Sequence, residues 1–123
     1  MHELSVCQAL LRQVAEIAER RGASAVERIT IAVGPLSGIE PELLASAFTI
    51  LRGGSCAAQA QLSIESTMVS ISCVACGMRS PAEPNRLVCA ACGGFRTRII
   101  TGDELGLRRL ELRVPQSGSA LTV

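Results

Sequence analysis

The sequence lacks lysine, tryptophan and tyrosine altogether, and it contains one histidine, His2. Without lysine, neither Schiff-base chemistry nor a phosphate-binding loop of the usual kind can be built. His2 lies close to a chain end, where order is commonly low, so a Ser-His-Asp triad is not expected. Only Phe48 and Phe95 are aromatic, whereas proteins that bind single-stranded nucleic acid stack bases on several rings. We therefore expect a protein that is not an enzyme and does not bind nucleic acid.

The sequence also lacks a long apolar run, although 48% of its residues are hydrophobic. A membrane-spanning helix needs about 20 consecutive apolar residues, and the first residues lack the basic-then-apolar order of a secretory signal. We therefore expect no membrane partner and a cytoplasmic location. In that reducing compartment Cys7 and Cys56 can persist as unpaired, buried thiols. The net charge of +1 further argues against a general nucleic-acid binder.

The other four cysteines form two Cys-x-x-Cys pairs, Cys73 with Cys76 and Cys89 with Cys92, separated by twelve residues. Two such pairs can surround one tetrahedral metal ion with four thiolates, as in structural zinc sites. A glycine follows the second cysteine of each pair, where a permissive backbone lets nearby amides turn toward the sulfurs. Two disulfides or a thiol redox pair are the alternatives. Because a four-sulfur site leaves no open position for substrate, we expect Zn(II) with a structural role.

Two helices are predicted. Apolar side chains recur at helical spacing over residues 4–18, which indicates an amphipathic helix. Ser5 and Gln8 resemble a capping box at its start, and Gly22 supplies its stop. Residues 41–51 form the second predicted helix, which begins at a proline and carries an apolar inner face.

Three strands are predicted, because residues 26–33, 60–66 and 107–114 alternate apolar and polar side chains. The cysteine pairs lie between the second and third strands, so they belong to an insertion. The predicted fold is α+β, a small three-stranded sheet packed with two helices and carrying an inserted four-cysteine, zinc-ribbon-like lobe. The expected divisions are residues 1–66 with 103–114 as an α/β domain, 67–102 as a zinc-binding domain and 115–123 as a disordered tail.

The lengths of the first helix and the first strand predict where the N-terminus lies. A helix of about 18 residues is about 27 Å long, and a strand of about eight residues is about 26 Å long. The short link at residues 22–25 makes the two antiparallel. The end of the strand near Gly34 then returns beside the start of the helix. This brings His2 and Glu3 toward the loop that ends in Glu40.

The first three residues carry the donors of a chelating group. The Met1 amine, the His2 amide nitrogen and the His2 imidazole can form adjacent chelate rings around one ion, and Glu3 can add a donor. Nitrogen donors in a plane suit Ni(II) or Cu(II). The alternative is that His2 has no role, that Glu3 only complements the helix dipole, and that Glu40 is an ordinary acidic residue.

Several motifs occur in an order typical of one family: Met1-His2-Glu3-Leu4-Ser5, Gly34-Pro35-Leu36-Ser37-Gly38-Ile39-Glu40-Pro41-Glu42, the two Cys-x-x-Cys pairs, Gly102-Asp103-Glu104-Leu105 and Leu110-Glu111-Leu112. From residue 1 to about residue 114 the sequence resembles the HypA/HybF family of hydrogenase-maturation nickel chaperones. A Met-His-Glu opening alone would be a weak signal. Its combination with the cysteine spacing is specific.

The resemblance implies a protein that delivers Ni(II) to the large-subunit precursor of [NiFe] hydrogenase, together with a nickel-binding GTPase accessory protein. It implies transient nickel binding by His2, supported by Glu3, and structural zinc in the four cysteines. The α/β domain would then be the nickel-binding domain. Glu40 transfers as an auxiliary nickel ligand. Pro35 departs from the acidic or small residue usual in its loop.

Two other kinds of protein share part of this pattern. A zinc-ribbon adaptor binds a protein or nucleic-acid partner without nickel, and in such a protein His2 would have no role. A dithiol redox protein would need a cysteine pair that reacts without metal. Zinc content separates the second alternative from the chaperone, and nickel binding separates the first.

Overall fold

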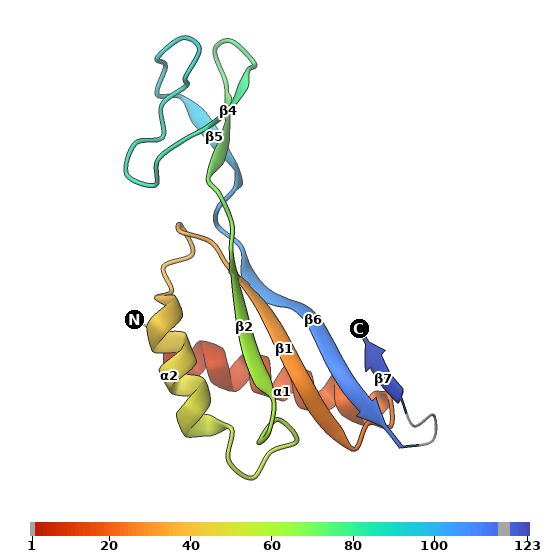
Figure 1. The fold of residues 1–123 in the computed structure, drawn as a ribbon. Coiled ribbons are helices and arrows are strands. Elements are labelled where there is room, and N and C mark those ends of the chain that lie inside the picture. Colours follow the sequence, from red (N-terminus) through yellow and green to blue (C-terminus); the bar gives the residue numbers. More distant parts are fainter. Residues whose placement is uncertain (1, 116–118) are drawn as a thin grey trace.

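The computed structural model describes residues 2–115 and 119–123, which form a helix-covered sheet and a smaller sheet beyond its end (Figure 1). The elements, in chain order, are α1 (Glu3–Arg20), β1 (Ala25–Val33), α2 (Pro41–Leu51), β2 (Gln61–Ser66), β3 (Ser70–Cys73), β4 (Arg79–Pro81), β5 (Thr97–Thr101), β6 (Leu105–Val114) and β7 (Ser119–Thr122).

The larger sheet has the strand order β2-β1-β6-β7, and the smaller sheet has the order β4-β3-β5. In the larger sheet β1 runs parallel to β2 and antiparallel to β6. The predicted α+β fold, with two helices and an inserted four-cysteine segment, is confirmed. The three predicted strands are β1, β2 and β6, and a fourth strand, β7, adds to the sheet beside β6.

The core lies between the two helices and the larger sheet. The apolar residues of α1 and α2 fall at helical spacing, so each helix presents one apolar stripe to the sheet. The buried residues of this core are Cys7, Leu10, Val14, Ala18, Val26, Ile29, Ile31, Val33, Leu44, Ala47, Phe48, Ala57, Ala60, Leu110 and Leu112. Each large apolar side chain buried here contributes about 1.5–3 kcal/mol. Neither described helix has the length and apolar character that crossing a membrane requires.

Helix α1 begins and ends where predicted, at Glu3 and before Gly22, but without the predicted capping box. Its N-cap is His2, which forms no side-chain capping bond, so the predicted capping box of Ser5 and Gln8 is wrong. A carboxylate in the first turn still complements the helix dipole. At the other end the Ala23 N–H donates to the Ala18 carbonyl (2.9 Å) and the Gly22 N–H to that of Glu19 (3.1 Å). This pair of bonds is a Schellman motif.

The C-terminal segment differs from the predicted disordered tail. Ser119–Thr122 forms β7, which pairs antiparallel with β6 from Glu111 to Val114. The backbone N–H and carbonyl of Val123 also bond Leu110, at 2.7 and 2.8 Å. The prediction of disorder is therefore wrong for these residues, and residues 116–118 lie outside the described part of the chain. A short terminal segment without an apolar period can become ordered when it completes a sheet edge.

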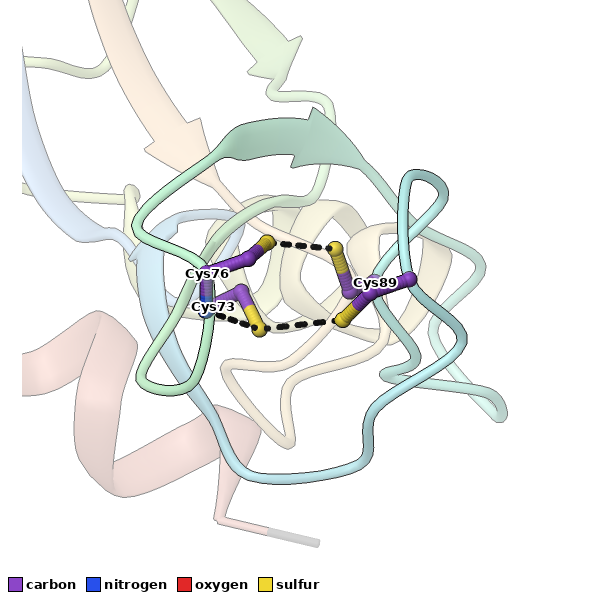
Figure 2. A group of neighbouring side chains, drawn as sticks. Cys73, Cys76 and Cys89 are labelled. Carbon is purple, nitrogen blue, oxygen red and sulfur yellow. Dashed lines mark hydrogen bonds between the residues drawn. The ribbon is translucent and has the colours of Figure 1, made fainter.

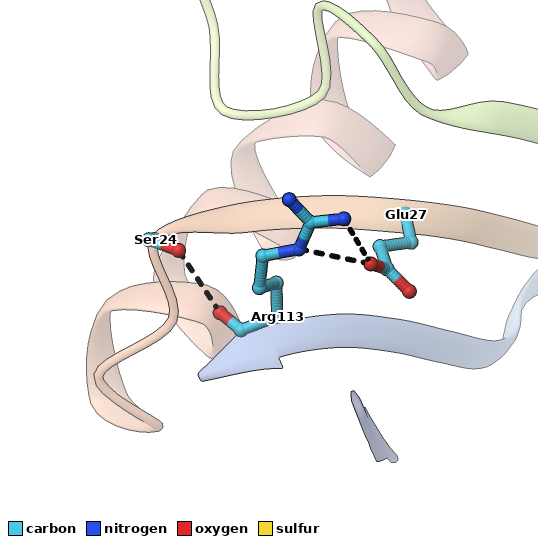
Figure 3. A network of polar contacts seen from close by, with 3 residues as sticks. All are labelled: Ser24, Glu27 and Arg113. Atoms are coloured by element: carbon cyan, nitrogen blue, oxygen red, sulfur yellow. Dashed lines mark hydrogen bonds and ion pairs between the residues drawn. The ribbon is translucent and has the colours of Figure 1, made fainter. Parts of the chain in front are cut away.

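Polar contacts set the register where α1 turns into β1 (Figure 3). The Arg113 guanidinium of β6 donates from Nε and from one terminal nitrogen to the same carboxylate oxygen of Glu27, at 3.0 and 2.8 Å. The Ser24 backbone N–H and hydroxyl both donate to the Arg113 carbonyl, at 2.8 and 3.3 Å. Exposed ion pairs of this kind contribute at most about 1 kcal/mol, so their main effect is on alignment.

The two sheets join where β1 ends. Strands β2 and β6 flank β1. Past the last residue of β1, Val33, the segments next to them in sequence, β3 and β5, pair directly with each other. Gly34 fills this narrow point. A Cβ atom on Gly34 would overlap the Gly102 carbonyl and lie 2.9 Å from the Asp103 nitrogen. The close approach of two backbones therefore requires glycine at this position.

Glu104 ties the junction together. One of its carboxylate oxygens accepts the Gly102 N–H at 2.7 Å and the Thr67 hydroxyl at 2.8 Å. Its backbone carbonyl accepts the Gly34 N–H at 2.7 Å, and the Gly102 carbonyl accepts the Leu36 N–H at 2.7 Å. The loop after β1 is thus bonded to the strands that lead into the smaller sheet.

Removing this carboxylate is expected to remove one contribution to the pH dependence of stability in the acid range. The Gly102 N–H and the Thr67 hydroxyl hold the pKa of Glu104 below its usual 4.5. A lowered pKa in the folded state stabilises the protein above pH 4.5 and loses its effect as the pH falls through the lowered value. Glu104→Gln should therefore be less stable than wild type at neutral pH, with the difference shrinking below pH 4.5.

Urea denaturation of both proteins at several pH values would measure this difference. Loss of a bound metal in acid would lower the stability of both proteins equally. The difference between their free energies of unfolding therefore reports the effect of the Glu104 carboxylate alone. Glu83→Gln is the matched control, because Glu83 is an exposed acid outside the junction. If the difference in free energy of unfolding between wild type and Glu104→Gln stays constant from neutral pH to about pH 3, the assigned role of Glu104 is contradicted.

Candidate metal centres

The four cysteines of the two pairs meet at the far end of the smaller sheet from the helices (Figures 1 and 2). Cys73 ends β3, and Cys89 lies in the segment between β4 and β5. The four sulfur atoms all lie within 4.8 Å of one another. Cys73 and Cys89 are buried, whereas Cys76 and Cys92 are exposed. The predicted grouping of these residues is confirmed.

The spacing of the sulfurs fits a tetrahedral metal ion. The Cys73 and Cys92 sulfurs are 3.6 Å apart, and so are those of Cys76 and Cys89. Zinc–sulfur bonds of about 2.3 Å place the corners of a tetrahedron about 3.8 Å apart. Disulfide sulfurs lie at about 2.05 Å. The structure therefore matches a shared ion, and it does not match the alternative of two disulfides.

Two turns of the same design carry the sulfurs. The N–H of Gly77 donates to the Cys73 carbonyl and that of Gly93 to the Cys89 carbonyl, both at 2.9 Å. Both glycines have positive φ, +77° and +74°, a conformation that other residues adopt at a cost. The Cys76 N–H also points back at the Cys73 sulfur, at 3.5 Å. The glycine that follows each pair is thus required by the turn.

Backbone dipoles favour thiolates at the two buried sulfurs. The N–H groups of Cys92 and Ala91 lower the pKa of Cys89 to about 6. The N–H group of Cys76 likewise holds the pKa of Cys73 below its usual value. The lowered pKa values of Cys73 and Cys89 favour metal binding, because the thiolate is the ligand form.

The exposed sulfurs behave in the opposite way. The Met78 N–H acts to lower the pKa of Cys76, but the Cys89 sulfur, burial and the other two sulfurs together outweigh this effect, and the pKa rises to about 12. Two negative sulfurs at such short range repel each other. A divalent cation among them removes that repulsion and deprotonates the remaining thiols. The charge pattern of the four sulfurs therefore fits a bound divalent ion.

The N-terminal candidate residues come from two helix starts that lie together. The Glu3 carboxylate accepts the backbone N–H of Glu40 at 3.0 Å. His2 is the exposed N-cap of α1, and Glu40 is the N-cap of α2. The predicted approach of the first residues to the loop ending in Glu40 is therefore observed. Met1 lies outside the described residues.

Glu3 is the buried member of this group, with 7% of its surface exposed. The Glu40 N–H, which donates to the Glu3 carboxylate, is among the groups that lower the pKa of Glu3 to about 2. Its carboxylate therefore stays charged at every physiological pH and holds the starts of α1 and α2 together. The sequence pattern predicted that these residues meet, but it did not reveal that a carboxylate makes the contact.

Two contacts that position the cysteine turns were not predicted. The Ser80 hydroxyl oxygen of β4 accepts the Ala90 N–H at 3.3 Å, and the Thr97 hydroxyl of β5 donates to the Leu87 carbonyl at 3.0 Å. Serine and threonine carry no spacing signal that would have indicated these partners. In the described part of the chain, the four cysteines are the one group of metal-binding side chains found close enough to share an ion.

The fold and the four-sulfur group together define a small metal-binding α+β protein. The family described as "Hydrogenase/urease nickel incorporation, metallochaperone, hypA" matches residues 1–112. The chain is 38% identical over 114 residues to a hydrogenase maturation factor HypA of Aquifex aeolicus, covering 93% of this chain and 99% of that one. It is 39% identical over 112 residues to HypA of Nitrosospira multiformis, covering 91% and 97%.

Solved structures agree with these sequence relatives. The solution structure of the Ni metallochaperone HypA from Helicobacter pylori superposes with a TM-score of 0.69 at 30% identity, covering 93% of this chain and 99% of that one. A second solution structure, of a HypA protein, gives a TM-score of 0.70 at 31% identity, covering 91% and 96%. The chain belongs to the HypA family of nickel-incorporation metallochaperones, as the resemblance of its motifs predicted.

Proposed function

We propose that this protein binds Ni(II) transiently at its N-terminus and delivers it to the large-subunit precursor of [NiFe] hydrogenase. A GTPase accessory protein of hydrogenase maturation is the proposed second partner. The protein acts as a carrier of the ion and has no catalytic residue. Its membership of a nickel-incorporation family supports this role.

The contact between Glu3 and the Glu40 backbone carries the proposal, because it gives the first residues a defined place. The carboxylate holds the loop before α2 against the start of α1 at 3.0 Å. The exposed His2 is the residue immediately before that anchor. The proposed nickel ligands are the Met1 amine and the His2 amide and imidazole nitrogens, with Glu3 and Glu40 as auxiliary oxygen donors. Such a nitrogen set suits Ni(II).

An exposed terminal site also suits release. Its donors bind the metal only when deprotonated, so acid weakens binding. A ligand set at the chain end can exchange its donors one at a time with those of a docked partner, which allows transfer without free nickel. His2 is exposed at the start of a helix, where a partner can reach it.

The four-cysteine site has a different proposed role. Residues 67–102 form a zinc-binding domain in this proposal, and residues 1–66 with 103–114 form the nickel-binding domain. Zn(II) held by Cys73, Cys76, Cys89 and Cys92 would have four protein ligands and no open position, so it would act as a structural link and not as cargo. The sulfur spacing of 3.6 Å supports this assignment.

His2→Ala is expected to abolish binding of one Ni(II) per chain while leaving one zinc in place. The imidazole is the one side-chain nitrogen of the proposed terminal set, and the four cysteines do not involve His2. Calorimetric titration of zinc-loaded protein with an untagged N-terminus measures both variants, and metal analysis of the same samples gives the zinc content.

The two acidic residues around Pro41 provide a matched pair of variants. Glu40→Gln should weaken nickel binding, whereas Glu42→Gln, in the first turn of α2, should leave it unchanged. If His2→Ala binds nickel as tightly as wild type, the terminal site is wrong. If wild type itself binds no nickel, a zinc-ribbon adaptor would be the better account of the chain.

A further inference from the structure

One edge of the larger sheet has no partner strand in the described part of the chain. β2 pairs only with β1, through a parallel register from Arg28 with Gln61 to Val33 with Ser66. The N–H and C=O groups on the outer side of such an edge strand can pair with an extended segment of another chain. Figure 1 shows α2 beside this edge and roughly along it.

A cavity of about 570 Å³ opens at this edge, between α2 and β2. Phe48, Thr49 and Arg52 line its helix side. Leu62 packs against the core. Its neighbour Gln61 lies on the other face of the strand, where its side chain accepts a hydrogen bond from Arg28. Leu62 and Gln61 both line the cavity. The cavity therefore reaches both faces of β2. An added strand would place alternate side chains on these two faces.

Arg52 brings an uncompensated positive charge to the cavity. Its guanidinium lies over the Phe48 ring, 4.6 Å from the centroid, and donates to the Ala60 carbonyl. Its Nε is buried without a hydrogen-bond partner, and no carboxylate of the described residues pairs with it. A buried, unpaired donor on a charged group is destabilising. A carboxylate from outside the chain would pair with this charge.

A second arginine lies on the opposite face. Arg28 is held by the Gln61 side chain at 3.1 Å and by Glu111 at 3.3 Å, and about half of its side chain is exposed. Cations thus stand on both sides of the β2 edge, where the alternate side chains of an added strand would project. The charge of the groove is complementary to an acidic extended segment.

We propose that the groove between α2 and the edge of β2 binds an extended, acidic segment of a partner protein as an additional strand. Carboxylates on the two faces of that segment pair with Arg52 on the α2 side and approach Arg28 on the opposite side. A second copy of this chain fits less well. The one carboxylate of β2, Glu65, already pairs with Arg108 and Arg109, at 3.4 and 3.9 Å, so β2 of another copy has no free acid to offer.

The test is an NMR titration of full-length, zinc-loaded protein with an acetylated six-residue peptide, Val-Asp-Asp-Val-Asp-Asp, which as a strand places aspartates on both of its faces. Saturable shifts are expected for residues 45–52 and 61–63, together with slower amide exchange in β2. A peptide with asparagine in place of aspartate should bind about tenfold more weakly, since it loses a charged hydrogen bond. Arg52→Gln should lower the affinity of the protein for the aspartate peptide by a similar factor.

Two further variants keep the test decisive. Arg28→Gln changes the exposed face and should weaken binding even if Arg52→Gln fails to fold, whereas Arg12→Gln, on exposed α1 surface, should bind like wild type. Absence of saturable shifts, shifts centred outside the groove, or equal binding of both peptides would overturn the proposal. Protection of β2 amides that rises with protein concentration alone would also overturn it, in favour of pairing between two copies.

Discussion

Cys89→Ser is expected to remove tight metal binding and to unfold much of the segment from residue 67 to residue 102. The segment has little core of its own, because its large apolar side chains are mostly exposed, as with Phe95 at 83% and Met68 at 77%. Structural zinc in a small module contributes on the order of 10 kcal/mol to folding. Loss of one of four thiolates removes most of that contribution. A metal ion held by the four cysteines would therefore stabilise this segment more than its apolar contacts do.

Two measurements check this expectation. Metal analysis after dialysis gives the zinc content, and two-dimensional amide spectra show which residues lose their dispersed signals. The signals of α1, α2 and the larger sheet should persist, because their core contains no residue of the segment. Cys56→Ser is the matched control, since Cys56 lies outside the four-sulfur group. If Cys89→Ser keeps one zinc and the native spectrum, the assigned role of the site is refuted.

Gly34→Ala is expected to destabilise the protein by about 3 kcal/mol or more, since overpacking a rigid point forces the backbone apart. The added methyl group would overlap the Gly102 carbonyl and approach the Asp103 nitrogen to 2.9 Å. Gly102 is fixed by two hydrogen bonds, because its carbonyl accepts the Leu36 N–H and its N–H donates to the Glu104 carboxylate. Gly102 cannot move away without breaking the bonds that join the two sheets.

Urea denaturation measures this effect as a lower midpoint. Gly106→Ala serves as the control, because no atom lies within 4 Å of a Cβ added at that position. Its effect should stay within about 1 kcal/mol. An unchanged midpoint for Gly34→Ala would show that the junction tolerates displacement and that Gly34 is not required by the close approach of the two backbones.

The secondary structure of the larger sheet and its helices was predictable to within one or two residues at most boundaries. Its signals are periodic and local: helical spacing before Gly22, a proline at the start of α2, and alternation in the strands. The predictions that failed concern the ends of the chain. Helix α1 begins at Glu3, within the predicted range, but His2 is its N-cap and the predicted capping box of Ser5 and Gln8 does not form. β7 had no periodic signal of its own and became a strand by pairing with β6.

The meeting of the first residues with Glu40 was partly predictable. It followed from the equal lengths of α1 and β1 and from the short turn at Gly22, which forms its expected bonds. Length alone did not indicate the Glu3 contact, because a hydrogen bond between side chain and backbone leaves no pattern in the sequence. The roles of His2, Glu3 and Glu40 in nickel binding stay predictions.

The sequence by itself determined the four-cysteine site and the two turns that form it. Each turn is local, since it needs only two cysteines, two intervening residues and a glycine that adopts positive φ. Tertiary structure alone decided the junction at Gly34 and the groove of Arg52. Both depend on which strands become neighbours: β1 ends between the strands that join β3 to β5, and β2 stays at an edge. Strand order is set by packing of the whole core, and no short stretch of sequence records it.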